Sequence, residues 1–172
     1  DDASKADSYI YAIPLDRLSE VSSQDQLSAF VLKGNGMGLP RGDISADPDS
    51  VDYPTAMVKG RGQNLYFATT ENLFNSDFGN HRLYLLNKNA SNVLTKRPLT
   101  LVNGPTVIRQ MIFLKGDTVQ EDTLLLAGAG GLFSCKLKDL NCTPLNTNMN
   151  TRDGRGLALV PGIFGSKPTF IM

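Results

Sequence analysis

The sequence predicts an all-β protein, and three observations support this prediction. Short apolar runs rich in aromatic and branched residues recur along the 172-residue chain, and polar segments separate them. The chain has 16 glycines and 9 prolines, the residue types that mark turns between strands. Helical periodicity is weak, because the best helical candidate, residues 15–27, has ragged apolar spacing and contains Ser22 and Ser23.

Six segments are expected to be strands because each is apolar and has Gly, Pro, Asn or Asp close to both ends. In chain order they are SYIYAI (8–13), NLYFATT (64–70), RLYLLN (82–87), TVIRQMIFL (106–114), TLLLAGA (123–129) and LFSCKL (132–137). Their short length and close spacing are typical of antiparallel sheets connected by tight turns.

An internal repeat organises these strands. The segment LYFATTENLF (65–74) aligns with LLLAGAGGLF (124–133) at an offset of 59, with four of ten positions identical. PTAMVKG (54–60) resembles residues 105–116 at an offset of 51, and residues 11–18 resemble 133–140 at an offset of 122. A period near 60 residues indicates one supersecondary unit used repeatedly.

The repeat predicts a β-propeller segment of about three four-stranded antiparallel blades. Within one domain, 1–172, the expected units are roughly 1–53, 54–104 and 105–153, with a partial unit at 154–172. A β-sandwich, which also strings short strands together, is the alternative. Closed propellers typically have four or more blades, so we expect either that this is a segment of a larger propeller or that a protein partner or another copy of the chain completes the ring. Open sheet edges favour such association.

One stretch resembles a known family. Residues 54–89 combine a Pro-x-hydrophobic strand with LYFATT and, further on, SD and LYLL. This pattern is similar to a unit in the C-terminal propeller of the type IV pilus-tip adhesins (the PilY/PilC family). The matching positions are Pro54, Leu65, Tyr66, Phe67, Thr69, Leu73, Ser76, Asp77, Leu83 and Tyr84. Two features depart from the family: Ala68-Thr69-Thr70 replaces its GTG, and this chain has no Trp.

The resemblance implies a quinoprotein-like propeller and a role in adhesion outside the cytoplasm. Quinone-dependent propellers use Trp-rich cofactor sites, so the lack of Trp gives no support for a quinone cofactor.

Composition and motifs argue against several function classes. Seventeen basic residues balance 17 acidic ones, which leaves no excess of positive charge to neutralise a nucleic-acid backbone. The longest apolar run, 124–133, is too short to span a membrane.

GAGG (128–131) is expected between two strands, whereas a dinucleotide-binding loop joins a strand to a helix. His81, the only histidine, makes a poor catalytic triad with Ser76 and Asp77. We therefore expect no enzymatic activity.

The long segment 34–53 is the expected binding loop, because it has no strand pattern and lies between predicted sheets. Arg41-Gly42-Asp43 spells a tripeptide that many integrin ligands display, although an ordinary turn is the simpler interpretation. The same loop has oxygen-bearing side chains at alternating positions, as a calcium loop does. They are Asp43, Ser45, Asp47, Asp49 and Asp52; a solvated acidic loop is the alternative.

Cys135 and Cys142 are predicted to form a disulfide. If CKLKDLNC is a hairpin with Lys138-Asp139 at its tip, the two cysteines lie directly opposite each other, within bridging distance. Two free thiols are the alternative. Asn89-Ala90-Ser91 and Asn141-Cys142-Thr143 are N-glycosylation sequons, and composition alone predicts about two of them.

The sequence thus favours a non-catalytic binding or assembly module located outside the cytoplasm: periplasmic, on the cell surface or secreted. No cofactor is expected, apart from Ca²⁺ if the acidic loop binds it. The alternatives are part of a propeller hydrolase or lyase, and a scaffold subunit of an envelope complex. Nucleic acid and membrane insertion are not expected.

Overall fold

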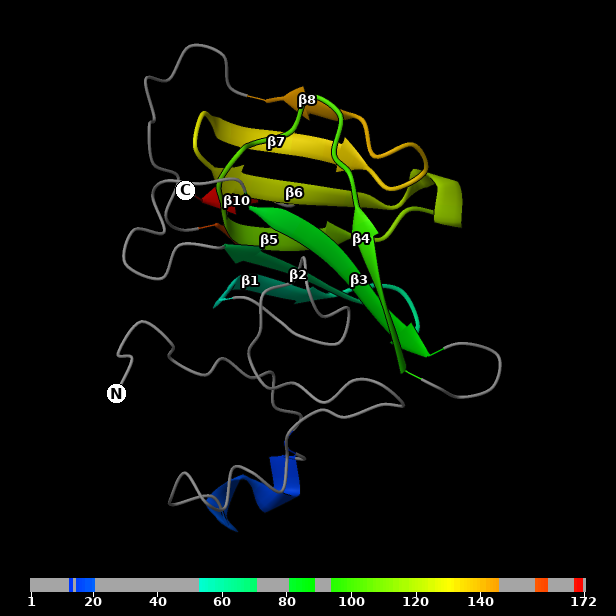
Figure 1. Cartoon of the computed structure of the whole chain (residues 1–172), viewed down its shortest axis with the longest axis vertical. Helices are drawn as coiled ribbons and strands as arrows, with labels where there is room; N and C mark the ends of the chain where they lie inside the picture. The colour runs from blue at the N-terminus through cyan, green and yellow to red at the C-terminus, as the bar shows by residue number, and fades with distance from the viewer. Residues whose placement is uncertain are drawn as a thin grey trace, which may run out of the picture.

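The structure is a computed structural model that describes residues 13, 15–20, 53–70, 81–88, 94–145, 157–160 and 169–171 (Figure 1). Its strands are β1 (Tyr53–Lys59), β2 (Leu65–Thr70), β3 (Arg82–Lys88), β4 (Leu94–Leu99), β5 (Ile108–Leu114), β6 (Thr123–Gly128), β7 (Gly131–Lys136), β8 (Cys142–Pro144), β9 (Ala158–Val160) and β10 (Thr169–Ile171). Two 3₁₀-helices complete the description: η1 (Leu15–Glu20) and η3 (Val119–Glu121).

The strands form two four-stranded antiparallel sheets, in the orders β1-β2-β3-β4 and β5-β6-β7-β8, and β9 pairs with β10 in a separate hairpin. We call the two sheets the first unit and the second unit. The prediction of a mainly β protein with four-stranded antiparallel sheets is confirmed. The described residues show no closed sheet.

The sequence repeat corresponds to a structural repeat. In each unit the first strand slips by one residue against the second, at Thr55 in β1 and at Arg109 in β5. Just beyond the slip, Met57 lies opposite Phe67 and Met111 lies opposite Leu126. Phe67 and Leu126 are the positions that the 59-residue offset aligns. The same irregularity therefore occupies equivalent places in both units.

Apolar side chains from both units form one core between the sheets. The Tyr66 ring of β2 stacks on the Phe113 ring of β5, with centroids 6.2 Å apart. The buried members of this core are Tyr66, Ala68, Leu83, Leu85, Leu99, Ile108, Met111, Leu124, Leu126, Cys135 and Cys142. Because the members come from strands of both units, the two sheets pack against each other mainly by burial of apolar surface.

Both faces of the central strands are buried. In β2 every residue from Tyr66 to Thr70 is buried, and in β6 every residue from Leu124 to Gly128 is buried. Successive residues of a strand point to opposite faces, so neither sheet has a solvated face there. On the far side of the second unit, Leu125, Ala127 and Leu132 form a separate core with Leu157. A two-sheet sandwich leaves the outer faces exposed, and these strands do not follow that pattern.

The expected strand at 8–13 lies outside the described residues except for Ile13, which is not in a strand. Residues 15–20 form η1, and the residues aligned with 15–18, 137–140, lie in the β7–β8 turn rather than in a strand. Residues 11, 12 and 14 lie outside the described residues, so the alignment of 11–18 with 133–140 stays a prediction. Leu15 and Leu18 are 89% and 55% exposed. Their spacing of three matches one turn of a 3₁₀-helix and not the period of two of a strand.

Candidate functional site

The loop that the sequence favoured as the binding site lies outside the described residues. This applies to the tripeptide Arg41, Gly42 and Asp43 and to the calcium ligands Asp43, Ser45, Asp47, Asp49 and Asp52. Within the described ranges, no group of three or more His, Cys, Asp or Glu side chains could hold a metal ion. Integrin-type recognition and calcium binding by this loop stay predictions.

A polar cluster joins the first unit to the second, and we call it the first seam. It consists of Thr55, His81 and Ile108. The Ile108 N–H donates to His81 Nδ1 (3.0 Å), and the Thr55 hydroxyl donates to the Ile108 carbonyl (2.9 Å). Both backbone polar groups of Ile108 are thus held by side chains of the preceding unit. His81 Nδ1 also lies 3.0 Å from the Ile108 carbonyl oxygen and 3.3 Å from the Thr55 hydroxyl oxygen.

These contacts give His81 a role that sequence motifs did not reveal. Its backbone N–H also donates to the Thr106 carbonyl (2.8 Å), which ties the start of β3 to the linker before β5. Ser76 and Asp77, the other members of the weak triad, lie outside the described residues. The contacts of His81 described here are those of a residue that positions the next unit.

A second seam repeats this device between the second unit and the segment that leads into β9. Gln110 of β5 donates from Nε2 to the Leu157 carbonyl, and its Oε1 accepts from the Leu157 N–H, both at 2.9 Å. Gln110 is the first paired residue after the slip in β5, just as Ala56 follows Thr55 in β1. At each seam, side chains of one unit form hydrogen bonds with both the N–H and the C=O of one later residue. That residue is Ile108, the first of β5, at the first seam and Leu157, just before β9, at the second.

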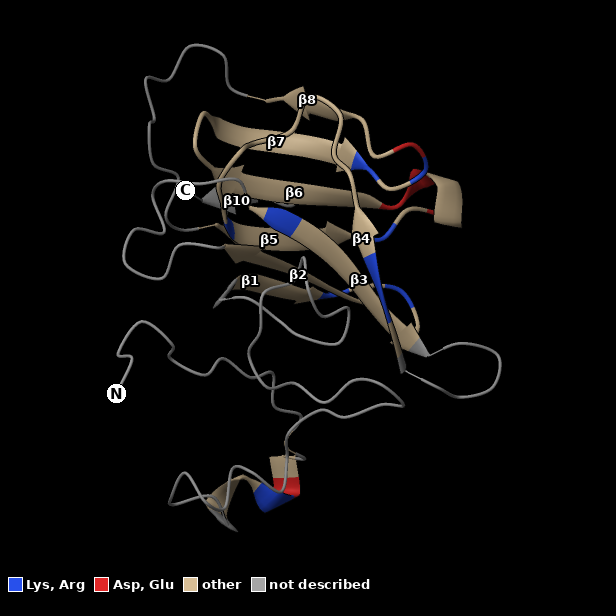
Figure 2. Ribbon diagram, in the orientation of Figure 1, with Lys and Arg blue, Asp and Glu red and all other residues tan. Residues whose placement is uncertain are grey.

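An ion pair bridges the two units at their charged end. Arg61, in the β1–β2 turn, donates from Nε to Asp122 Oδ2 (2.8 Å) and from Nη2 to Oδ1 (2.6 Å). The same guanidinium donates to the Gly116 carbonyl (2.7 Å). Figure 2 shows charged residues at this end, around the β5–β6 connection and the β7–β8 turn, whereas the middle of β6 and β7 has none.

The environment of Asp122 explains its ionisation. Its side chain is 4% exposed, and Oδ1 also accepts from the Gly116 N–H (3.0 Å). The hydrogen bonds from Arg61 lower the pKa of the Asp122 carboxyl below its ordinary value, against the opposing effect of burial. The reciprocal hydrogen bond raises the pKa of Arg61. The charged forms of both groups are therefore favoured in the folded protein.

A pocket of about 480 Å³ opens beside the first seam, where β3 starts and the β4–β5 linker passes. Its lining includes the apolar side chains of Leu83, Leu99 and Leu101 and the exposed residues Thr100 and Thr106. The complete lining is His81, Arg82, Leu83, Pro98, Leu99, Thr100, Leu101, Gly104, Pro105 and Thr106. An apolar hollow with a few polar groups suits a ligand that has an apolar body and a polar or anionic end.

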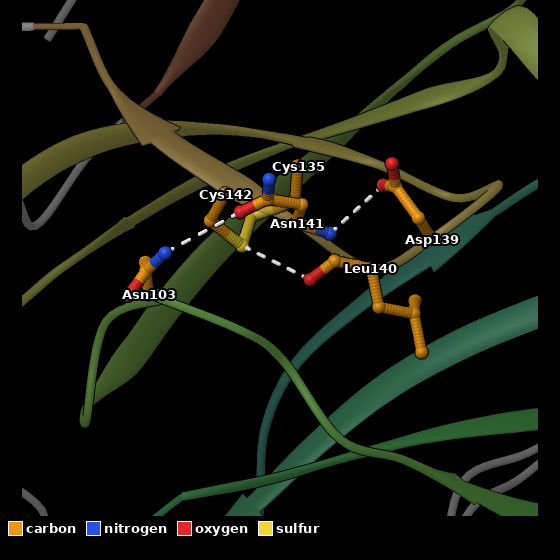
Figure 3. The surroundings of a disulfide bond; sticks show 6 residues. All are labelled: Asn103, Cys135, Asp139, Leu140, Asn141 and Cys142. Carbon is orange, nitrogen blue, oxygen red and sulfur yellow. Dashed lines mark hydrogen bonds between the residues drawn. A yellow bond between two sulfur atoms is a disulfide. The ribbon is translucent and has the colours of Figure 1, made fainter.

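The predicted disulfide is confirmed. Cys135 and Cys142 are bonded, lie opposite each other on β7 and β8, and have Cα atoms 3.9 Å apart (Figure 3). The tip of the hairpin differs from the prediction, because residues 137–140 all belong to the turn. The Leu140 N–H donates to the Lys136 carbonyl (2.8 Å), and Leu140 has a φ of 56°. The longer turn keeps the cysteine register because Lys136 still pairs with Asn141 (3.1 Å).

Sequence reasoning missed the pocket and both seams. Thr55, Gln110 and Asp122 are common residue types in no recognisable motif, and their partners lie 47 to 61 residues away. The one available signal was the Leu101–Pro105 segment, whose Asn, Gly and Pro mark an irregular linker.

Comparisons with protein families, curated proteins and solved structures found no match to this chain. In the part of the chain that the structure describes, no helix is long and apolar enough to cross a membrane. The disulfide is compatible with an extracytoplasmic location.

Proposed function

We propose that this chain is a non-catalytic, extracytoplasmic binding and assembly module whose four-stranded units stack in series as propeller blades. The observation that carries the proposal is the repeated seam. In both seams, side chains bind the N–H and the C=O of one later residue. Thr55 and His81 bind Ile108, and Gln110, one residue beyond the position equivalent to Thr55, binds Leu157. A contact that recurs between successive units is what a serial assembly requires.

Burial on both faces of β2 and β6 supports blades over a sandwich. In a propeller each blade is covered by a neighbour on either side, so its central strands are buried throughout. The described residues supply two complete four-stranded units and one strand pair. Propellers typically close with four or more blades, so further units are expected from the remainder of a longer chain, from another copy of the chain or from a protein partner.

The pocket beside the first seam supports a binding role. It is formed by the end of one unit and the linker to the next, so its shape depends on how the units stack. The resemblance of residues 54–89 to pilus-tip adhesins favours the cell surface as the place of action, and the buried disulfide fits an oxidising compartment.

Sedimentation velocity over a range of protein concentrations, combined with small-angle X-ray scattering, tests the assembly. We expect concentration-dependent association and, in the largest species, the shape of a closed ring. A monomer at every concentration with a compact, closed shape would contradict the proposal.

A seam variant then tests the stacking rule. Gln110→Ala removes both hydrogen bonds to Leu157 and is expected to speed hydrogen exchange of the Leu157 amide and weaken association. Gln63→Ala, at an exposed position in the β1–β2 turn, is the matched control and leaves both measurements unchanged. Equal behaviour of the two variants would refute the role of the seam.

A further inference from the structure

The sequon Asn141-Cys142-Thr143 lies at the start of β8, on the surface of the second unit. Asn141 and Thr143 are exposed, whereas Cys142 between them is 3% exposed and belongs to the core. Alternate residues of a strand point to opposite sides, so the disulfide that holds Cys142 inward leaves its two neighbours pointing outward. The fold therefore presents both chemically required residues of the sequon to solvent.

The side-chain amide of Asn141 is oriented so that its nitrogen can carry a substituent. Asn103 Nδ2 donates to Asn141 Oδ1 (3.5 Å), and the Asn141 backbone N–H donates to Asp139 Oδ1 (3.1 Å). Figure 3 shows the Asn141 amide nitrogen directed away from both partners. A sugar on Nδ2 leaves Oδ1 free to accept and the backbone N–H free to donate, so both hydrogen bonds persist.

The position also suits a bulky group. β8 is the last strand of its sheet, and the strand at the other edge, β5, is the one that contacts β1. Among the described residues, the outer side of β8 meets a short piece of the linker, where Val102 bridges to Asn141 and the Cys142 N–H donates to the Val102 carbonyl (2.9 Å). A glycan here would project from the edge of the sheet, clear of both seams.

We propose that Asn141 is an N-glycosylation site. In the reaction the Asn141 amide nitrogen attacks the anomeric carbon of a polyprenyl-pyrophosphate-linked oligosaccharide. A carbon–nitrogen bond forms, the carbon–oxygen bond to the pyrophosphate breaks, and the amide loses one proton, with no change of oxidation state. The proposal rests on the extracytoplasmic location proposed above, because the lipid-linked donor is used on the luminal or outer side of the membrane.

The test is secretion of the full chain from a cell line with an N-glycosylation pathway, followed by digestion with peptide N-glycosidase and peptide mass mapping. We expect a glycan on the peptide that contains Asn141. Asn141→Gln and Thr143→Ala are each expected to remove it, while Asn89→Gln, which removes the other sequon, leaves it in place. Because the side chains of Asn141 and Thr143 are exposed, the variants at these two positions are expected to fold.

Two results would overturn the proposal, and they differ in meaning. A secreted chain with the Cys135–Cys142 bridge closed but Asn141 unmodified refutes glycosylation and leaves the location intact. A chain that is retained with both thiols reduced refutes the location, and with it the glycan. Thermal melting before and after enzymatic removal of the sugar gives a further check, since a glycan clear of the core should shift the melting temperature by less than about 2 °C.

Discussion

Opening the Cys135–Cys142 bridge is expected to lower the free energy of unfolding by about 2.4 kcal/mol. The bridge closes a short loop, with a sequence separation of 7. In the chain-entropy treatment, that loop length corresponds to about 2.4 kcal/mol at 25 °C. For a chain of this size, each kcal/mol shifts the melting temperature by about 2–4 °C, so the expected drop is about 5–10 °C.

Burial makes this value a lower limit. Cys135 is 0% exposed and Cys142 is 3% exposed, so two separate thiols must fit into a core packed for one bridge. Fitting extra volume into a packed core costs about 1–3 kcal/mol. The melting temperature of the reduced protein is therefore expected to fall by about 10 °C or more, the larger end of the expected drop.

The assay compares thermal melts, followed by circular dichroism, of the oxidised chain and of the chain refolded under reducing conditions. The double variant Cys135→Ala with Cys142→Ala is the control, because its melting temperature must not respond to reductant. Intact-mass analysis of the oxidised chain should show two hydrogens fewer than the reduced chain. Oxidised and reduced proteins that melt within about 1 °C of each other would refute the reasoning.

Three further predictions concern the core, one close backbone approach and the ion pair. Leu126→Ala, at a fully buried position, is expected to lower the free energy of unfolding, measured with denaturant, by about 3 kcal/mol. Met57→Ala, at a 44% exposed position, should lower it by less than about 1 kcal/mol, and equal losses for the two variants would contradict the assigned core. Gly128→Ala places a Cβ against a backbone carbonyl of the segment before β5 and should destabilise at least as much as Leu126→Ala, so a variant with native stability would show that the two backbones are not in contact. The pKa of Asp122 is lowered in the folded protein, so its contribution is present above its unfolded pKa of about 3.9 and is lost as the pH falls through the lower folded value. Melting curves from about pH 6 to about pH 2 should therefore fall less steeply for Arg61→Ala than for the native chain, and parallel curves would disprove the coupling.

The strands and the disulfide were readable from the sequence because their causes are local. Apolar runs such as LYFATT and TLLLAG need only their own residues and nearby turns to define them, and both are strands. The cysteines are close in sequence, so a single hairpin sets their register. The repeat was also visible, because equivalent positions in the two units, such as Phe67 and Leu126, face equivalent surroundings and accept similar side chains.

The sequence by itself thus determined β2, β3, β5, β6 and β7, the grouping of strands into fours and the paired cysteines. Only the tertiary structure decided how the units meet. Thr55, Gln110 and Arg61 acquire their roles from partners 47 to 61 residues away, and ordinary polar residues carry no mark of a distant partner. Such contacts require long loops to be closed, and burial of the apolar faces offsets the entropy cost of closing them. They therefore depend on how the sheets pack and not on the local pattern of residues along the sequence.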